Sequence, residues 1–134
     1  MKRSDINKAL KAQLATGGTA LSGTWPNIEP QGTMIRPYFE VLFPTQSRTG
    51  QFISGDVVEE SGLLGVVIVV EFGTGEDAVN DYADAVADIF YQTLTISITG
   101  GLITIEQPAN IAQGYRDNAD WRVPLTISYS ARNT

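Results

Sequence analysis

The sequence contains neither cysteine nor histidine. Without these residues the chain can form no disulfide, no thiolate nucleophile, no zinc site of the usual Cys/His type and no Ser-His-Asp triad. Carboxylates, hydroxyls and a few basic groups are the side chains left for chemistry. We therefore expect a protein that is not an enzyme.

Long apolar runs are also missing. The longest, from Leu63 to Val70, is interrupted by Gly65 and ends at Glu71, whereas a bilayer-spanning helix needs roughly 20 apolar residues. The amino end lacks the apolar segment and small-residue cleavage site of an export signal. We expect no membrane segment, synthesis in the cytoplasm and, from the length of 134 residues and a hydrophobic content of 43%, one packed domain over residues 1–134.

Positive charge is scarce outside the amino end. All three lysines and Arg3 lie in the first 11 residues, where Asp5 is the one acidic residue, so this segment carries +3. The other 123 residues carry −9, which gives the net charge of −6. Because tight nucleic-acid binding depends on neutralising phosphates with Lys and Arg, this acidic body argues against it.

The hydrophobic periodicity predicts an α+β fold with the element order α-β-β-α-β-β-β. Helices are expected over residues 4–15, with Ser4 as N-cap, and 74–91, with Thr74 as N-cap and Asp77 in a capping box. An antiparallel or mixed sheet of four to five strands is expected, with both helices packed on one face. The predicted strands cover residues 35–43, 63–72, 121–130 and a hairpin over 93–107, and a short strand at 51–53 is a further candidate.

The hairpin is predicted to turn at Gly100 and Gly101, which form a two-residue glycine turn. Counting outward from this turn gives a register in which the isoleucines share one face. The predicted pairs are Ile98 with Ile103 and Ile96 with Ile105.

Residues 44–62 are polar and are expected to form a long loop, of the kind that is usually functional or mobile. Arg48 lies in this loop. It is either a solvated loop residue or a contact to a neighbouring subunit or an axial partner. Trp25 and Trp121 are expected to pack in or beside the core.

The strand over 63–72 is apolar on both faces, with Val67 and Val69 on the second face. Two helices can cover one face only, so Val67, Val69 and the neighbouring Leu42 and Leu64 need another cover. Long loops of the same chain or a second subunit could supply it, and we expect an oligomer.

An aspartate stripe runs along the outer side of the second predicted helix. It is a solvated face, a charged subunit contact or a site for Mg²⁺ or Ca²⁺, whose preferred ligands are oxygens. Lys8 and Lys11 lie on the first helix away from its apolar line, and we hypothesise that they meet the stripe of a neighbouring subunit. The stripe consists of Asp77, Asp81, Asp84 and Asp88.

The segment from Gly73 to Ala78 matches the pattern G-x-G-x-x-A of dinucleotide-binding turns. A pyrophosphate at this helix terminus would meet Glu76 and Asp77, and a hairpin rather than a parallel strand follows the helix. We therefore interpret the motif as a tight turn and expect no nucleotide cofactor.

The order and spacing of these segments resemble the tail terminator proteins of long-tailed bacteriophages, the group that includes the minor tail protein U type and gene transfer agent relatives. The chain departs from that pattern at Glu59-Glu60, and at Glu71-Phe72 where the family usually has a proline. The resemblance rests on the amino-terminal helix followed by Trp25-Pro26-Asn27, the strand from Tyr38 to Phe43, Arg48, the strand from Gly65 to Val70, the turn from Gly73 to Glu76 with its helix, and Trp121-Arg122-Val123.

The resemblance implies a non-enzymatic virion protein at the head-proximal end of the tail. Such a protein forms a homohexameric ring on the tail tube, stops further polymerisation and presents a surface to the head-completion protein. DNA would pass through the lumen without specific binding. No cofactor is implied, and assistance of assembly by Mg²⁺ is the one role left open. The alternatives are another head-tail connector or tail-tube subunit and, in a different class, an acidic domain that binds a small ligand or a divalent metal.

Overall fold

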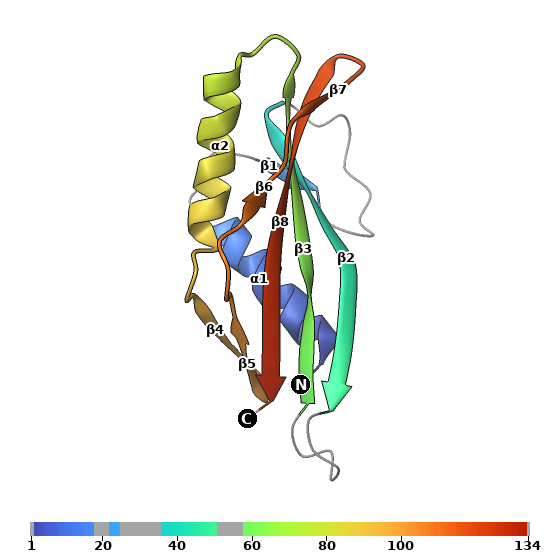
Figure 1. The fold of residues 1–134 in the computed structure, drawn as a ribbon, viewed down its shortest axis with the longest axis vertical. Coiled ribbons are helices and arrows are strands. Elements are labelled where there is room, and N and C mark those ends of the chain that lie inside the picture. The colour runs from blue at the N-terminus through green and yellow to red at the C-terminus, as the bar shows by residue number, and fades with distance from the viewer. Residues whose placement is uncertain (1, 18–21, 25–35, 51–57, 134) are drawn as a thin grey trace.

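The computed structural model describes residues 2–17, 22–24, 36–50 and 58–133. Within them, two helices accompany a long, mostly antiparallel sheet of eight strands (Figure 1). The elements are α1 (Arg3–Thr16), β1 (Ser22–Thr24), β2 (Tyr38–Gly50), β3 (Val58–Glu71), α2 (Glu76–Ile89), β4 (Thr95–Ile98), β5 (Gly101–Thr104), β6 (Asn110–Ile111), β7 (Tyr115–Asp117) and β8 (Asp120–Asn133).

The sheet has the strand order β1-β2-β3-β8-β5-β4, and β6 and β7 also pair with β8. Among the described strands, β1 and β2 pair in parallel and all other pairs are antiparallel. The α+β class is therefore confirmed, but the predicted count of four to five strands and the predicted order are wrong in detail. The additional strands β1, β6 and β7 have only two or three residues each, which is too short for a periodic pattern to reveal them.

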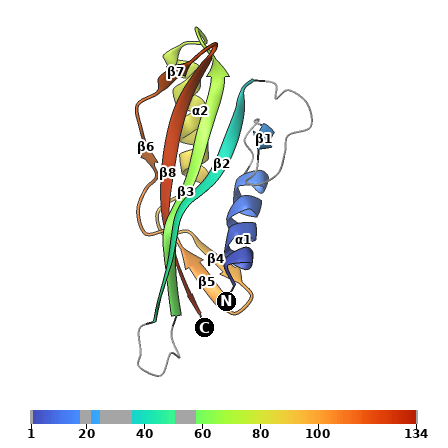
Figure 2. The ribbon, with the colours of Figure 1, turned by 90° about the vertical axis from the view of Figure 1, so that its right-hand side faces the viewer.

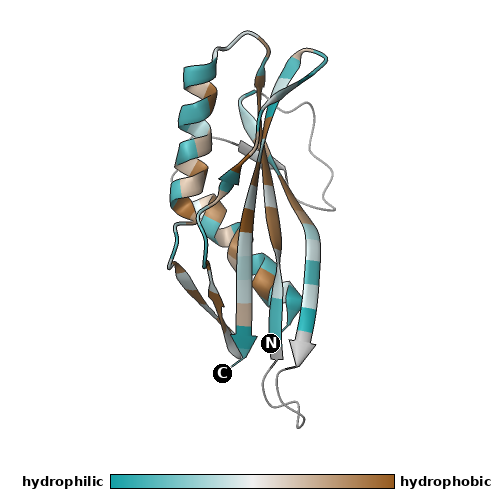
Figure 3. Cartoon of the chain, in the orientation of Figure 1, coloured by the Kyte–Doolittle hydropathy of each residue, from teal (hydrophilic) through white to brown (hydrophobic). Residues whose placement is uncertain are grey.

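The centre of the sheet is the antiparallel pair of β3 and β8, whose register runs from Glu59 opposite Arg132 to Glu71 opposite Asp120. One face of this pair forms the core together with both helices. Figure 2 shows α1 beside the sheet, and Figure 3 shows hydrophobic residues along β3 and hydrophilic ones along the outer side of α2. The helices contribute Ile6, Leu10 and Leu14 from α1 and Val79, Ala83, Val86 and Ile89 from α2.

Both helices begin differently from the predictions. Helix α1 starts at Arg3, so Ser4 is inside it and is not the N-cap. Gly75 occupies the N-cap position of α2 with a positive φ of 100°, a backbone conformation that glycine adopts at little cost. The Thr74 hydroxyl consequently lies outside the helix and donates to the carbonyl oxygen of Glu71 at 2.6 Å. The predicted capping box with Asp77 is therefore wrong.

The β4-β5 hairpin forms where the sequence predicts it, but with another register. Its turn lies between Ile98 and Gly101, so Thr99 and Gly100 are the central residues, and Ile96 pairs with Ile103. Gly100 has a φ of 78°. The register differs from the prediction by two residues, which leaves the isoleucines on the same face because side chains alternate with a period of two.

The polar segment 44–62 is mostly strand and not a long loop. Strand β2 continues to Gly50 and β3 begins at Val58, and the two strands pair along this whole extension. A bulge between Leu42 and Thr45 interrupts the pairing beside Pro44, and this break disturbs the alternation that would otherwise indicate one long strand. Residues 51–57, including the candidate strand at 51–53, lie outside the described residues, as does Trp25.

Candidate interaction surfaces

The aspartates of α2 lie where the sequence predicts them. All four point away from the core on the exposed side of the helix, and none forms an ion pair with a residue that the structure describes. We call this surface the acidic face of α2. Its members are Asp77, Asp81, Asp84 and Asp88.

The lysines of α1 form a matching set of opposite charge. Lys8 is exposed and Lys11 is half-buried, and neither has a carboxylate partner among the described residues. Ala12 and Ala15 are exposed next to them. We call these four residues the basic face of α1.

The arginines, in contrast, have partners within the chain. Five of the six form ion pairs with carboxylates, and Arg116 lies over the ring of Phe72 with its guanidinium carbon 4.0 Å from the ring centre. The fold therefore uses its guanidinium groups internally, whereas the lysine amines of α1 and the carboxylates of α2 have no ion-pair partner among the residues that the structure describes. The pairs are Arg3 and Arg48 with Glu60, Arg36 with Asp120, Arg122 with Glu40 and Asp117, and Arg132 with Glu59.

Arg48 does not lie in a loop but on β2, beside the fully buried carboxylate of Glu60 on β3. A terminal nitrogen of Arg48 is 3.4 Å from Glu60 Oε2, and Arg3 Nε of α1 donates to Oε1 at 3.1 Å. Both arginine side chains remain about half exposed, at 49% and 57%. Arg48 therefore has a structural partner inside the chain, and its exposed part remains available to a neighbour.

A second polar contact lies close to this ion pair. The side-chain amide of Gln46 donates to the hydroxyl of Tyr129 at 2.8 Å and to Oδ1 of Asn7 at 2.5 Å. Burial raises the pKa of the Tyr129 phenol above its ordinary value of 10.0, and the hydrogen bond from Gln46 opposes this while the charge of Glu60 adds to it. Together the two clusters join α1 to β2, β3 and β8 through partly buried polar contacts.

Val67 and Val69 lie on the face of β3 opposite the helices, as predicted, and both are buried, with exposed fractions of 9% and 0%. Their neighbours in the sheet are Glu40 and Tyr38 of β2, and Arg122 of β8 donates to Glu40 at 2.9 Å. Burial alone would lower the pKa of Arg122, but the hydrogen bond and charge of Glu40 outweigh it and raise the pKa. The burial of these valines within one chain means that their position alone requires no neighbouring subunit.

Leu64 and Leu42, which were also predicted on this face, differ in burial. Leu64 belongs to the main core on the helix side and is fully buried, so its predicted position on the second face is wrong. Leu42 is 49% exposed. Below the valines the second face carries hydroxyl side chains around a shallow hollow, among them Ser61, Ser128 and Ser130.

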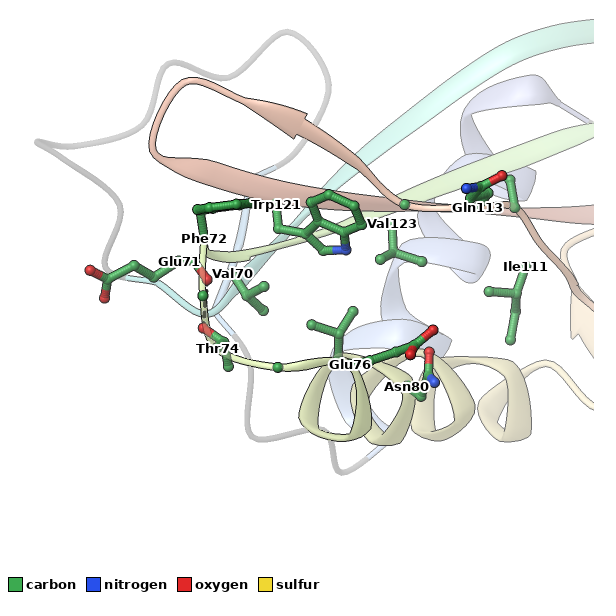
Figure 4. A pocket seen from close by; sticks show the side chains of 15 residues that line it. Val70, Glu71, Phe72, Thr74, Glu76, Asn80, Ile111, Gln113, Trp121 and Val123 are labelled. Carbon is green, nitrogen blue, oxygen red and sulfur yellow. Dashed lines mark hydrogen bonds between the residues drawn. The ribbon is translucent and has the colours of Figure 1, made fainter.

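A groove of about 680 Å³ lies between the start of α2 and the first part of β8 (Figure 4). Trp121 and Val123 form one wall and Glu76 and Asn80 the other, with Ile111 at one end. The indole N–H of Trp121 makes no hydrogen bond with the described part of the chain. Phe72, which the sequence predicts inside the central strand, is at the rim and 46% exposed.

The predicted turn at residues 73–78 also borders this groove. Gly73 and Gly75 both have positive φ, and the Glu76 side chain lies beside Asn80 on the groove side of α2 (Figure 4). Within the described ranges no group of three or more Asp or Glu side chains is arranged to hold a metal ion. Neither described helix has the length and apolar character that a membrane crossing requires.

Sequence reasoning missed Glu60, Arg3 and Gln46 because residues 44–62 were expected to be a loop. One signal was present. Glu60 is an even number of residues away from Leu64 and Val66, so a longer central strand would place its carboxylate on the same face as these core residues. A carboxylate buried on that face requires a cationic partner.

The chain has detectable similarity to known proteins. The model of a family described as phage tail terminator protein matches residues 5–129. A solved structure superposes with a TM-score of 0.78 at 21% sequence identity, and the alignment covers 98% of this chain and 96% of the other. At that identity the likeness shows a shared fold. None of the curated proteins compared with the sequence matches it.

Proposed function

The chain belongs to the phage tail terminator protein family, and we propose that it forms a ring that caps the tail tube and ends tail polymerisation. The ring would consist of six copies, lie at the head-proximal end of the virion tail and present a surface to the head-completion protein. The match over residues 5–129 is the observation that carries this proposal. The family is a structural one, which is consistent with a role without catalysis.

The surface of the chain supports assembly with further copies. It exposes large apolar side chains at Leu42, Phe72 and Tyr91, and the unpaired charges of α1 and α2 have opposite signs. Exposed apolar side chains and complementary charges are the usual components of subunit contacts. Of the residues predicted for an interface, we retain Lys8, Lys11 and the acidic face of α2 as primary contacts and Arg48 as a secondary one. Val67 and Val69 are left out because both are buried within the chain.

The proposed ring also offers an explanation for the net charge of −6. DNA must pass through the lumen, and arginines that are already paired with carboxylates offer little to phosphates. We propose that DNA slides through without being held. The hydroxyl-bearing side chains around Ser61 and Ser128 could line such a path without gripping it.

The proposal is tested by electron microscopy of the purified protein in negative stain, combined with light scattering after size-exclusion chromatography. We expect rings of uniform size that do not elongate, and shorter tubes when the ring protein is added to polymerising tail-tube protein. Long cylinders of the protein alone would favour a tube subunit instead. A monomer at high micromolar concentration, without effect on tube length, would overturn the proposal.

A further inference from the structure

We propose that the basic face of α1 in one copy packs against the acidic face of α2 in the next copy of the ring. This contact rests on the proposed ring and identifies the two surfaces that would close it. Since the arginines are used inside the chain, the unpaired cations of α1 and the unpaired anions of α2 are a complementary set.

The two faces have matching spacing. Lys8 and Lys11 are three residues apart, and Asp81, Asp84 and Asp88 are separated by three and four residues. Residues at these separations lie on one side of an α-helix. Lys8 and Lys11 are about 4.5 Å apart along the helix axis, as are Asp81 and Asp84, so two charge pairs can form side by side.

Small side chains accompany the charges on both helices. Ala12 and Ala15 continue the stripe of Lys8 on α1, and Ala85 is exposed between the aspartates of α2. Alanine allows two helix axes to approach to the short end of the usual range, about 8 Å. At such a distance the lysine stems can lie along the neighbouring helix with their amines next to the carboxylates.

The contact joins different surfaces of two identical chains, so it is heterologous. Contacts of this kind form closed rings when the rotation between copies closes and open filaments when it does not. Each copy would offer one basic helix and one acidic helix, and a closed ring would leave neither unpaired. Both helices pack on the same face of the sheet, which would place all the contacts in one layer of the ring.

Charge reversal tests the contact directly. The variant Lys8→Glu/Lys11→Glu makes α1 acidic, and Asp81→Lys/Asp84→Lys makes α2 basic. Like charges placed opposite each other are strongly unfavourable at an interface, so each variant should weaken association by roughly tenfold or more in sedimentation velocity. The variant that carries all four substitutions restores opposite charges and should form rings again, as should an equal mixture of the two reversed proteins.

A matched control carries the same change of charge as Asp81→Lys/Asp84→Lys, at positions outside the two helices. Glu71→Lys/Glu106→Lys alters two exposed carboxylates outside the acidic face and should leave ring formation at the wild-type level. Circular dichroism and thermal unfolding check that each variant is folded.

The outcomes separate this contact from the proposed function. If the wild-type protein forms rings and the reversed variants form them equally well, the helix contact is wrong and the ring stands. Loss of rings that the fourfold variant does not recover also overturns the contact. If the wild-type protein forms no rings, the proposed function is wrong, and the helix contact that rests on it is wrong as well.

Discussion

Glu60 is a charged residue whose carboxylate is fully buried, so the fold must supply it with partners of opposite charge. The two arginines that pair with it come from different elements, Arg3 from α1 and Arg48 from β2. A buried charge without a partner is strongly unfavourable, whereas a neutral side chain of similar shape is tolerated. The cluster therefore fixes the position of α1 on the sheet as long as both arginines are present.

Removal of the arginines should cost more stability than removal of the whole cluster. For Arg3→Met/Arg48→Met we expect the free energy of unfolding to fall by about 3 kcal/mol, because Glu60 stays buried and unpaired. Adding Glu60→Gln to this variant should recover a large part of the loss. Urea unfolding at neutral pH measures both differences, and a triple variant less stable than the double variant would contradict this account of Glu60.

Individual residues also show where sequence reasoning reaches its limit. The buried positions of α2 and the exposed aspartates were predictable, because a helix of 14 residues repeats its period often enough to be read. The caps were not, because Gly75 with its positive φ moves Thr74 outside the helix. Which residue becomes the N-cap depends on the backbone path of the preceding residues, and a local sequence pattern does not reveal that path.

At the scale of elements, the hairpin of β2 and β3 depends on a close backbone approach at Gly62. A Cβ placed on Gly62 would lie 2.4 Å from the carbonyl oxygen of Thr45 and 2.8 Å from the hydroxyl of Tyr129. Gly62 pairs with Gln46, the residue after the bulge between Leu42 and Thr45. The hairpin therefore needs a residue without a side chain at this position.

We expect Gly62→Ala to destabilise the protein by about 1–3 kcal/mol, since overpacking forces backbone shifts. Gly65 on the same strand is the matched control. Its Cβ would meet Leu42 and Pro44 at 3.5 Å or more, and alanine in a strand is otherwise favoured over glycine by about 0.5–1 kcal/mol. Thermal unfolding of the two variants should move the midpoint in opposite directions, and equal midpoints would show that the approach at Gly62 relaxes freely.

The elements also differ in how well the sequence predicts them. The β4-β5 hairpin was predictable in place and in face but not in register, because Thr99-Gly100 and Gly100-Gly101 are both acceptable turns. The extension of β2 and β3 was hidden because its outward side chains are polar and Pro44 breaks the alternation. A strand that is stabilised mainly by backbone hydrogen bonds and carries polar side chains cannot be recognised from hydrophobic alternation.

At the scale of the whole molecule, both helices share one face of the sheet, and within the described ranges no helix packs on the other face. The class of the fold and the placement of its two helices followed from periodicity. The groove at Trp121 did not, because it is formed by segments far apart in the sequence. The candidate surfaces on α1 and α2 were predictable, since each lies on one helix.

Divalent cations provide a test at this scale, because a metal-binding domain is the alternative of a different class. A ligand that binds only the folded state raises the melting temperature by mass action. We expect millimolar Mg²⁺ or Ca²⁺ to leave the melting temperature of the protein unchanged, since the aspartates of α2 are spread along the helix. A clear rise that Asp81→Asn/Asp84→Asn abolishes would favour the metal-binding alternative.

The placement of the lysines has a practical consequence. All three lie in the first 11 residues, two of them on one side of α1, and no other side chain of the protein carries a primary amine. A reagent that couples to lysine side chains therefore labels α1 and its N-cap residue Lys2 and leaves the side chains of the sheet and of α2 unlabelled. Fluorophores, biotin or gold particles attached in this way would mark the same surface on every copy, so the chain comes with its own site-selective chemical handle.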